Sequence, residues 1–232
     1  MTNILNGKYV VLKDAEVKNI LAENEALLSK VNLTEGDFDT AKAYHYDGYN
    51  PFTGKLVGYE KVVISGKKGQ LQVITMHDGK EVNSLSVIDV ATERGTFARY
   101  SGLNDKIELV DEEKMEMGLP VVIPNGLKHD EDFKVLSTAL DEVSEKGLPF
   151  CLNGYKHCGP GCGDGKTFGG GLPRNNIDSC CKAHDRCWDA FGDWNICCDA
   201  TLINCTLKYR SQDPWAADAI YSAFISNARA CM

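Results

Sequence analysis

Hydrophobic and polar residues follow two different periods along the first half of the chain. Between residues 14 and 30 the apolar side chains recur every three or four positions, which predicts an amphipathic helix. After Gly54 the pattern changes to segments rich in Val, Ile, Thr and Tyr, separated by short turns that contain glycine. We expect strands at residues 59–65, 70–77, 82–91, 96–100 and 106–110. Tight turns favour antiparallel neighbours, so this half is predicted to be an α+β domain, a helix followed by a meander.

The helical period returns in the second half of the chain. A helix is expected at residues 130–145, with Asp130 at its N-cap, and two amphipathic helices are expected near residues 177–190 and 194–210. Residues 214–230 contain several large apolar side chains. Such a segment can lie on a membrane, but we expect it to close a small hydrophobic core.

Cysteine content and charge divide the chain at the same place. All ten cysteines lie between Cys151 and Cys231, and this part has eight basic and eight acidic side chains, whereas residues 1–150 carry the whole formal net charge of −8. We therefore predict an acidic, cysteine-free α+β domain at residues 1–146, acting as a pro-region or regulatory domain. A small, disulfide-rich, all-α domain is predicted at residues 147–232. The acidic balance argues against nucleic acid as a partner.

The spacing of the cysteines predicts how the two amphipathic helices of the second domain pack. Cys180, His184 and Cys187 occupy helical positions i, i+4 and i+7, so they share one face. One register of antiparallel helices then permits two disulfides at once. These disulfides are Cys180–Cys205 and Cys187–Cys198. His184 would lie between them and face Asp199, and a histidine held by a buried carboxylate is a common general-base arrangement.

A neighbouring face of the same helix carries Cys181 and Asp185. Cys158 is the expected partner of Cys181, and this disulfide would bring the glycine-rich segment 157–161 over Asp185. Backbone carbonyls together with a carboxylate form an oxygen-rich site that suits Ca²⁺ better than a soft metal. Four cysteines remain, and the sequence does not choose among their three pairings. They are Cys151, Cys162, Cys197 and Cys231.

Three motifs together resemble the secreted phospholipase A2 family. Residues 180–187, with the sequence CCKAHDRC, fit the family pattern C-C-x-x-H-D-x-C, and residues 158–161 fit its C-G-x-G calcium loop. Cys198-Asp199, followed by Cys205, fits its second catalytic helix. The resemblance covers about residues 155–229. It implies a phospholipase A2-like fold for the second domain and Ca²⁺-dependent hydrolysis of the sn-2 acyl ester of glycerophospholipids.

The resemblance also implies a role for each site residue. His184 would be the general base that activates a water molecule, with Asp199 as its orienting carboxylate. The Ca²⁺ ligands would be the Asp185 side chain and the backbone carbonyls of His157, Gly159 and Gly161. The Gly159 N–H would join the cation in stabilising the oxyanion. Trp188 stands where many members of the family have a tyrosine, so the hydrogen bonding around Asp199 is left open.

Three other interpretations of the cysteine-rich domain stay open. It could be a disulfide scaffold in which the histidine and the aspartates are incidental, or a reduced domain in which Cys180, His184 and Cys187 bind zinc. Alternatively, it is a non-catalytic, membrane-active or toxin-like module carried by a binding domain. Free thiols with bound zinc would indicate the metal site, whereas blocked thiols and a Ca²⁺ requirement would indicate the hydrolase.

The expected partner of the second domain is a phospholipid membrane surface or a micelle. An acidic first domain would weaken binding to anionic membranes, so we expect residues 1–146 to restrain the phospholipase unit until the chain is cleaved near Lys146–Pro149. The alternative is that residues 1–146 form an independent domain on a linker. The density of disulfides predicts a secreted protein. No signal peptide is visible in residues 1–30, which leaves the export route open.

Overall fold

The computed structural model describes residues 4–50, 52–79, 81–103, 106–114, 119, 127–135, 151–152 and 154–232. The chain forms two compact units, a sheet unit and a helical unit. The sheet unit consists of Ile4–Asp47 and Gly58–Ser137, and the helical unit of Met1–Asn3, Gly48–Val57 and Thr138–Met232. The predicted domain boundary at residue 146 falls outside the described residues and stays a prediction. The expected helix at residues 130–145 is described only at its start, where residues 131–132 form a turn instead.

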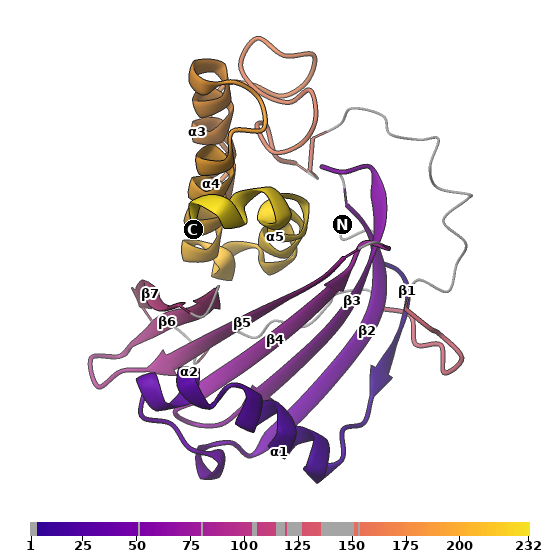
Figure 1. Ribbon diagram of the computed structural model, residues 1–232, viewed down its shortest axis with the longest axis vertical. Coiled ribbons are helices and arrows are strands. Elements are labelled where there is room, and N and C mark those ends of the chain that lie inside the picture. The colour runs from indigo at the N-terminus through magenta and orange to yellow at the C-terminus, as the bar shows by residue number, and fades with distance from the viewer. Residues whose placement is uncertain are drawn as a thin grey trace. The chain divides into compact units, whose positions relative to one another are not determined.

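A seven-stranded antiparallel sheet forms the centre of the sheet unit, with its strands in chain order (Figure 1). The predicted meander is confirmed, because each of the five expected segments lies in one of its strands. Two strands that the pattern did not predict, β1 (Ile4–Val10) and β2 (Thr40–Asn50), complete the sheet. The other strands are β3 (Lys55–Ser65), β4 (Gly69–His77), β5 (Val82–Ala91), β6 (Thr96–Leu103) and β7 (Lys106–Lys114).

The single helix predicted at residues 14–30 is divided into α1 (Asp14–Glu23) and α2 (Glu25–Lys30). Asn24 separates them, and its side-chain amide donates a hydrogen bond to the Ile20 carbonyl at 2.8 Å. An asparagine side chain that competes for backbone groups in this way favours the end of a helix. Figure 1 shows both helices lying across one face of the sheet, and a 3-10 helix, η1 (Glu35–Asp37), follows them in the chain.

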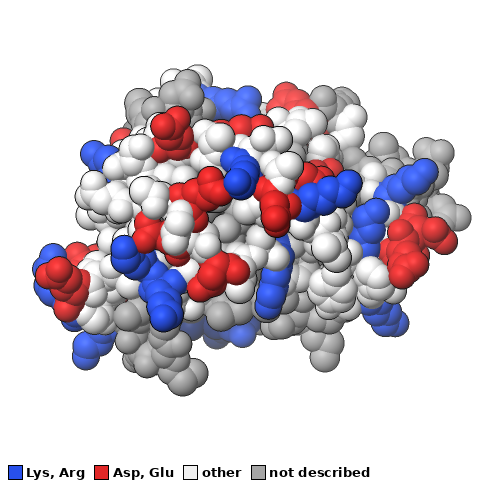
Figure 2. Space-filling view, turned by 90° about the horizontal axis from the view of Figure 1, so that it is seen from below, with Lys and Arg blue, Asp and Glu red and all other residues white. Residues whose placement is uncertain are grey.

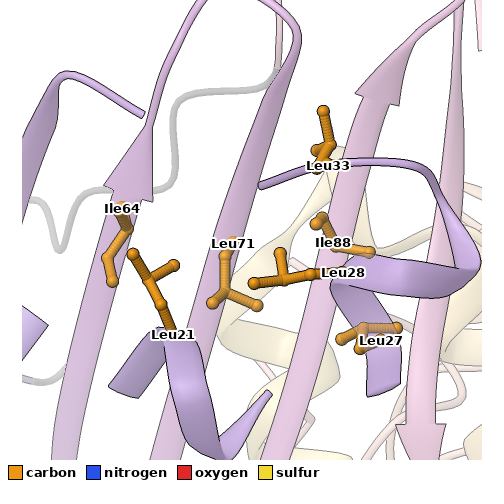
Figure 3. Packing of buried hydrophobic residues seen from close by; sticks show 7 residues of the cluster. All are labelled: Leu21, Leu27, Leu28, Leu33, Ile64, Leu71 and Ile88. Carbon is orange, nitrogen blue, oxygen red and sulfur yellow. The ribbon is translucent and has the colours of Figure 1, made fainter. Parts of the chain in front are cut away.

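Leucine side chains of the two helices form a hydrophobic core with the sheet (Figure 3). The cluster consists of Leu21, Leu27, Leu28, Leu33, Ile64, Leu71 and Ile88. Burial of an aliphatic side chain of this size contributes about 1.5–3 kcal/mol to the free energy of unfolding. The spacing of these leucines, which predicted an amphipathic helix, therefore also explains why α1 and α2 stay on the sheet.

Charged side chains of both signs are mixed on the surface. Figure 2 shows Lys and Arg interspersed with Asp and Glu on the face that it presents, and neither sign gathers into a broad patch among the described residues of that face. Two ion pairs of the sheet unit illustrate the mixing, Lys68–Asp37 at 2.8 Å and Lys18–Glu35 at 3.4 Å. Exposed pairs of this kind contribute little to stability, about 0–1 kcal/mol each.

The described part of the helical unit contains three α-helices: α3 (Asn176–Phe191), α4 (Ile196–Lys208) and α5 (Pro214–Ala228). The 3-10 helices η3 (Arg210–Gln212) and η4 (Arg229–Cys231) flank α5. Both predicted amphipathic helices are confirmed. Their first turns are fixed by side-chain caps, since Asn175 accepts a hydrogen bond from the Asp178 amide and Asn195 accepts from the Cys197 and Cys198 amides.

Five disulfides cross-link the helical unit, and no described cysteine is free. The three predicted disulfides are confirmed: Cys158–Cys181, Cys180–Cys205 and Cys187–Cys198. The pairing that the sequence left open is Cys151–Cys162 and Cys197–Cys231. Because Cys180 and Cys187 are both oxidised, neither can supply the thiolate that the alternative zinc site requires.

Helix α5 fills the core of the helical unit, as expected for residues 214–230. Ile220 and Ile225 are among its fully buried side chains, and Asp218 forms a buried, bidentate ion pair with Arg210 at 2.8–3.0 Å. The segment Gly48–Val57 belongs to this unit as well. Its buried Asn50 side chain donates a hydrogen bond to the Ala219 carbonyl at 2.9 Å. None of the helices among the described residues has the length and apolar character needed to cross a bilayer.

Candidate active site

His184 of α3 and Asp199 of α4 meet on the face that the two interhelical disulfides hold together. His184 Nε2 lies 2.7 Å from Asp199 Oδ1. The imidazole is 7 % exposed and the carboxylate is fully buried. Because a carboxylate oxygen only accepts, Nε2 carries the hydrogen of this bond and the lone pair of the neutral ring is on Nδ1. The structure therefore brings together the predicted base and its carboxylate, and fixes the tautomer that a base needs.

Two further side chains donate hydrogen bonds to Asp199. The indole Nε1 of Trp188 lies 3.0 Å from Oδ1, the same oxygen that accepts from His184. The side-chain amide of Asn227, in α5, lies 2.6 Å from Oδ2. A buried carboxylate is costly unless its oxygens find donors, and here both oxygens have them. Trp188, whose effect the sequence left open, is thus part of the hydrogen-bond network that holds the carboxylate.

Aromatic rings surround the imidazole of His184. The Trp188 ring lies 4.4 Å from it between centroids, and the Phe224 ring lies 5.2 Å away in an edge-on arrangement. Phe52, from the 48–57 segment of the same unit, packs edge-on against Phe224 at 5.6 Å. These rings give the imidazole an apolar surrounding on this side.

Asp178 fixes the backbone of the predicted calcium loop. Its carboxylate is fully buried in the first turn of α3 and accepts hydrogen bonds from the backbone amides of Lys156, His157 and Arg174 at 2.8–3.1 Å. The Cys158–Cys181 disulfide attaches the same loop to α3 from the next residue. The loop is therefore held at the helix face that carries Asp185, four positions beyond Cys181.

Asp185 has the features of a cation ligand. Its Oδ2 atom is buried and has no hydrogen-bond partner among the described residues, and the same is true of Nδ1 of His157, which lies 3.9 Å away. The other nitrogen of His157, Nε2, lies 3.0 Å from the Gly171 carbonyl and therefore carries the hydrogen. Two electron-rich atoms without a donor between them suit a positive charge. A Cβ on Gly163 would lie 2.8 Å from Oδ2 and would displace this carboxylate, and the φ of 133° at Gly163 also favours glycine.

Burial also changes the acidity of Asp185. It raises the pKa of this carboxyl from its usual value of 3.8 to about 7, against the opposing effect of the nearby Lys166 ammonium. Such a shift marks a carboxylate that lacks compensating positive charge in the protein itself. A bound cation would supply that charge.

The three predicted carbonyl ligands belong to a loop of tight backbone hydrogen bonds. The Gly159 carbonyl accepts from the Cys162 amide at 3.2 Å and the Gly161 carbonyl from the Phe168 amide at 2.9 Å. Each carbonyl oxygen keeps a second lone pair for a cation. Among the described residues there is no group of three or more His, Cys, Asp or Glu side chains that could hold a metal ion. The predicted calcium site has one carboxylate and three backbone carbonyls, so it does not contain three such side chains.

Sequence reasoning missed the residues that support the predicted site. Asn227 lies 28 positions after Asp199, and no pattern in α5 points to it. Asp178 is easier to find afterwards, because it stands in the first turn of a predicted helix beside a cap residue. Phe224 belongs to the segment 214–230, which is expected to close the core. It is buried there, and its ring also lies against His184.

No family model, no curated protein and no solved structure matches the chain. The function is therefore inferred from the geometry and chemistry of the residues described above.

Proposed function

We propose that this protein is a secreted, Ca²⁺-dependent phospholipase A2 that hydrolyses the sn-2 acyl ester of glycerophospholipids. The observation that carries the proposal is the buried His184–Asp199 pair, 2.7 Å apart, between α3 and α4. The neighbouring face of α3 carries Asp185, and the Cys158–Cys181 disulfide attaches the glycine-rich loop to that face. Five disulfides in the helical unit are typical of a protein that folds in an oxidising compartment.

In this proposal His184 acts as a general base. Its Nδ1 lone pair takes a proton from a water molecule while the water oxygen attacks the ester carbonyl carbon. Asp199 accepts the hydrogen bond from Nε2 and stabilises the imidazolium that forms. The imidazolium then gives its proton to the alcohol oxygen of the departing lysophospholipid, which restores the base. No covalent intermediate is needed, which agrees with a site whose described cysteines are all in disulfides.

The residues of the loop fit a calcium ion. Asp185 and the carbonyls of His157, Gly159 and Gly161 would hold it, and the Gly159 N–H would donate to the oxyanion. When bound, Ca²⁺ polarises the ester carbonyl and offsets the negative charge that develops on its oxygen. The buried, unpartnered Oδ2 of Asp185 supports this assignment, since an oxygen of that kind is rare without a ligand.

The test is fatty-acid release from phosphatidylcholine vesicles, with Ca²⁺ and with excess chelator. We expect His184→Gln to abolish release while Ca²⁺ still binds, and Asp185→Asn to raise the Ca²⁺ concentration required. His45→Gln, which changes a histidine of the sheet unit, is the matched control and should retain activity. Full activity of His184→Gln would remove this histidine from the mechanism.

The same assay separates the hydrolase from the alternative of a non-catalytic membrane-active module. Such a module would bind vesicles or release their contents without producing fatty acid at any Ca²⁺ concentration. Equal fatty-acid release with and without chelator would instead support hydrolysis and reject a catalytic role for Ca²⁺.

A further inference from the structure

The connection between α3 and α4 exposes a cluster of large apolar side chains. Phe191 is 73 % exposed, Trp194 59 % and Ile196 39 %, and all three lie within six consecutive residues. Single exposed apolar residues are ordinary, but neighbours on one turn form a patch that water does not favour. We name residues 191–196 the aromatic turn.

The backbone of the aromatic turn is held in an unfavourable conformation. Trp194 has φ of 62°, in the left-handed region that glycine and asparagine prefer and that is unfavourable for a bulky residue. Its carbonyl accepts a hydrogen bond from the side-chain amide of Asn227 at 2.9 Å, and the next residue, Asn195, caps α4. A backbone strained to keep a tryptophan at the surface indicates that the exposed ring has a use.

The aromatic turn is continuous with the candidate active site. The Trp194 ring lies 5.3 Å from Trp188 and 6.2 Å from Phe224, and both of these rings flank His184. The amide of Asn227 that holds the Trp194 carbonyl also donates to Asp199. Rings thus lead from the surface to the proposed base, and a lipid that meets the turn would have its ester close to His184.

Charge indicates which lipid surface the turn suits. Residues 151–232 carry eight basic and eight acidic side chains. The turn itself contains one charged residue, the acidic Asp193. Outside the turn, Lys166 forms an ion pair with Asp189 at 3.8 Å. Residues 151–232 therefore have no net positive charge that would favour anionic headgroups, whereas Trp and Phe partition well into the interface of an uncharged bilayer.

We propose that the aromatic turn inserts into the surface of zwitterionic phospholipid bilayers and docks the active site there. The proposal rests on the proposed function, since it names the membrane contact of the same site. Phe191 and Ile196 supply apolar area, and Trp194 anchors the turn at the level of the headgroups and ester bonds.

The experiment measures how strongly the full chain binds phosphatidylcholine vesicles, independently of whether it hydrolyses them. Every variant is made in a His184→Gln background and assayed by co-sedimentation with vesicles. We expect Phe191→Ser and Ile196→Ser each to weaken partitioning on the order of tenfold, with little dependence on salt. Leu109→Ser, which removes a 54 % exposed side chain from the sheet unit, is the matched control and should bind like the parent.

Fluorescence quenching tests whether Trp194 enters the bilayer. Phosphatidylcholine with brominated acyl chains should quench the tryptophan emission, and Trp194→Phe should remove most of the quenching while Trp215→Phe should not. In the otherwise unchanged chain, Phe191→Ser should hydrolyse a monomeric short-chain phosphatidylcholine at the parental rate but lose activity on vesicles.

Three results would overturn the docking proposal. The first is vesicle binding at the parental level by Phe191→Ser and Ile196→Ser. The second is quenching of tryptophan emission that persists in Trp194→Phe. The third is self-association of the chain, detected by sedimentation velocity and abolished by Phe191→Ser, which would make the turn a contact between two copies. Failure of the proposed function gives a different result, because the unchanged chain would then bind vesicles through the turn and release no fatty acid.

Discussion

At the scale of single residues, the proposed chemistry depends on how the Asp199 carboxylate is held. Three side chains donate to it: His184, Trp188 and Asn227. A hydrogen bond to a charged group contributes about 1.5–3 kcal/mol, which corresponds to roughly 10- to 150-fold in a rate if it is lost in the transition state. Among the described residues, Asn227 is the one donor to Oδ2, so its loss leaves that oxygen without a hydrogen bond from them.

We therefore predict that Asn227→Leu, which has a similar shape and no donor, lowers kcat by roughly 10- to 100-fold with little change in KM. Steady-state kinetics measures kcat and KM separately. Asn227→Gln, which keeps the amide, should recover part of the rate, and an unchanged kcat in Asn227→Leu would exclude a positioning role.

A second prediction at this scale concerns the pH dependence of Ca²⁺ binding. Burial raises the pKa of Asp185 to about 7, so in the calcium-free protein the carboxyl is mostly protonated below that pH and mostly charged above it. A cation competes with the proton, and Ca²⁺ affinity should fall about tenfold for each pH unit below 7 and level off above it. Calorimetry at several pH values measures this dependence. Asp185→Asn should flatten the curve, and an affinity independent of pH in the unchanged chain would contradict the ligand role.

The sequence predicted the residues of the site that belong to a local pattern and missed those that belong to the tertiary fold. His184 and Asp185 lie at fixed helical spacings from paired cysteines, so their faces follow from the period of the helix. Asn227 reaches Asp199 only because α5 packs beside α4, and no spacing in the chain encodes that contact.

At the scale of elements, the first turn of α3 fixes the loop that would bind the cation. Asp178 accepts three backbone amide hydrogen bonds from Lys156, His157 and Arg174, so one side chain positions two separate segments. Several glycines of the loop have positive φ, a backbone conformation that the loop sequence alone does not fix. Its order therefore depends on Asp178 and on two disulfides.

We predict that Asp178→Ala lowers both the stability of the helical unit and its affinity for Ca²⁺. Each buried amide left without a partner costs about 1–3 kcal/mol, and the backbone of His157 would lose its fixed position. Thermal unfolding with intact disulfides and calcium calorimetry measure the two effects. Asp178→Asn keeps one carbonyl acceptor and should fall between the parent and Asp178→Ala. A folded Asp178→Ala protein with parental calcium affinity would show that this loop does not contribute ligands.

Helices and strands were predicted where the local pattern is strong, and missed where it is not. The leucine spacing at residues 14–30 predicts helix throughout, but it does not register the Asn24 side chain that ends α1. Strand β2 went unpredicted because its alternation is interrupted by Asp47 and Gly48, residues that are uncommon within strands. Strand β1 contains Asn6 and Gly7, which are typical of a turn. Both strands form because neighbours in the sheet pair with them, which is tertiary information.

At the scale of the whole molecule, composition indicated two parts, and the structure has a sheet unit and a disulfide-rich helical unit. The position of one segment could not have been foreseen, because residues 48–57 belong to the helical unit although cysteine content places them with the first part of the chain. Phe52 and Asn50 contact α5 through single specific interactions, a ring contact and one hydrogen bond, and composition does not reveal such contacts.

This segment determines how the proposed restraint by residues 1–146 must be tested. A fragment that starts at Leu148 would lack Asn50 and Phe52, so any loss of activity could come from missing contacts within the helical unit. The better experiment keeps every residue and cuts one bond. A specific protease site is inserted beside Gly147, which lies outside the described residues, and the full chain is assayed before and after cleavage.

We predict that cleavage raises hydrolysis of vesicles containing anionic lipid by roughly tenfold at low salt, and raises hydrolysis of uncharged vesicles less. The reason is that residues 1–150 carry the whole net charge of −8, while residues 151–232 carry none, so the acidic part is repelled by an anionic surface. After the cut, one covalent connection between this part and the helical unit is lost, so it is held less closely to the site. Because exposed charges are screened, the gain should shrink as ionic strength rises. A chain with a scrambled site, treated with the same protease, controls for the treatment. Equal rates before and after cleavage on anionic vesicles at low salt would reject the restraint, whatever the rate on uncharged ones.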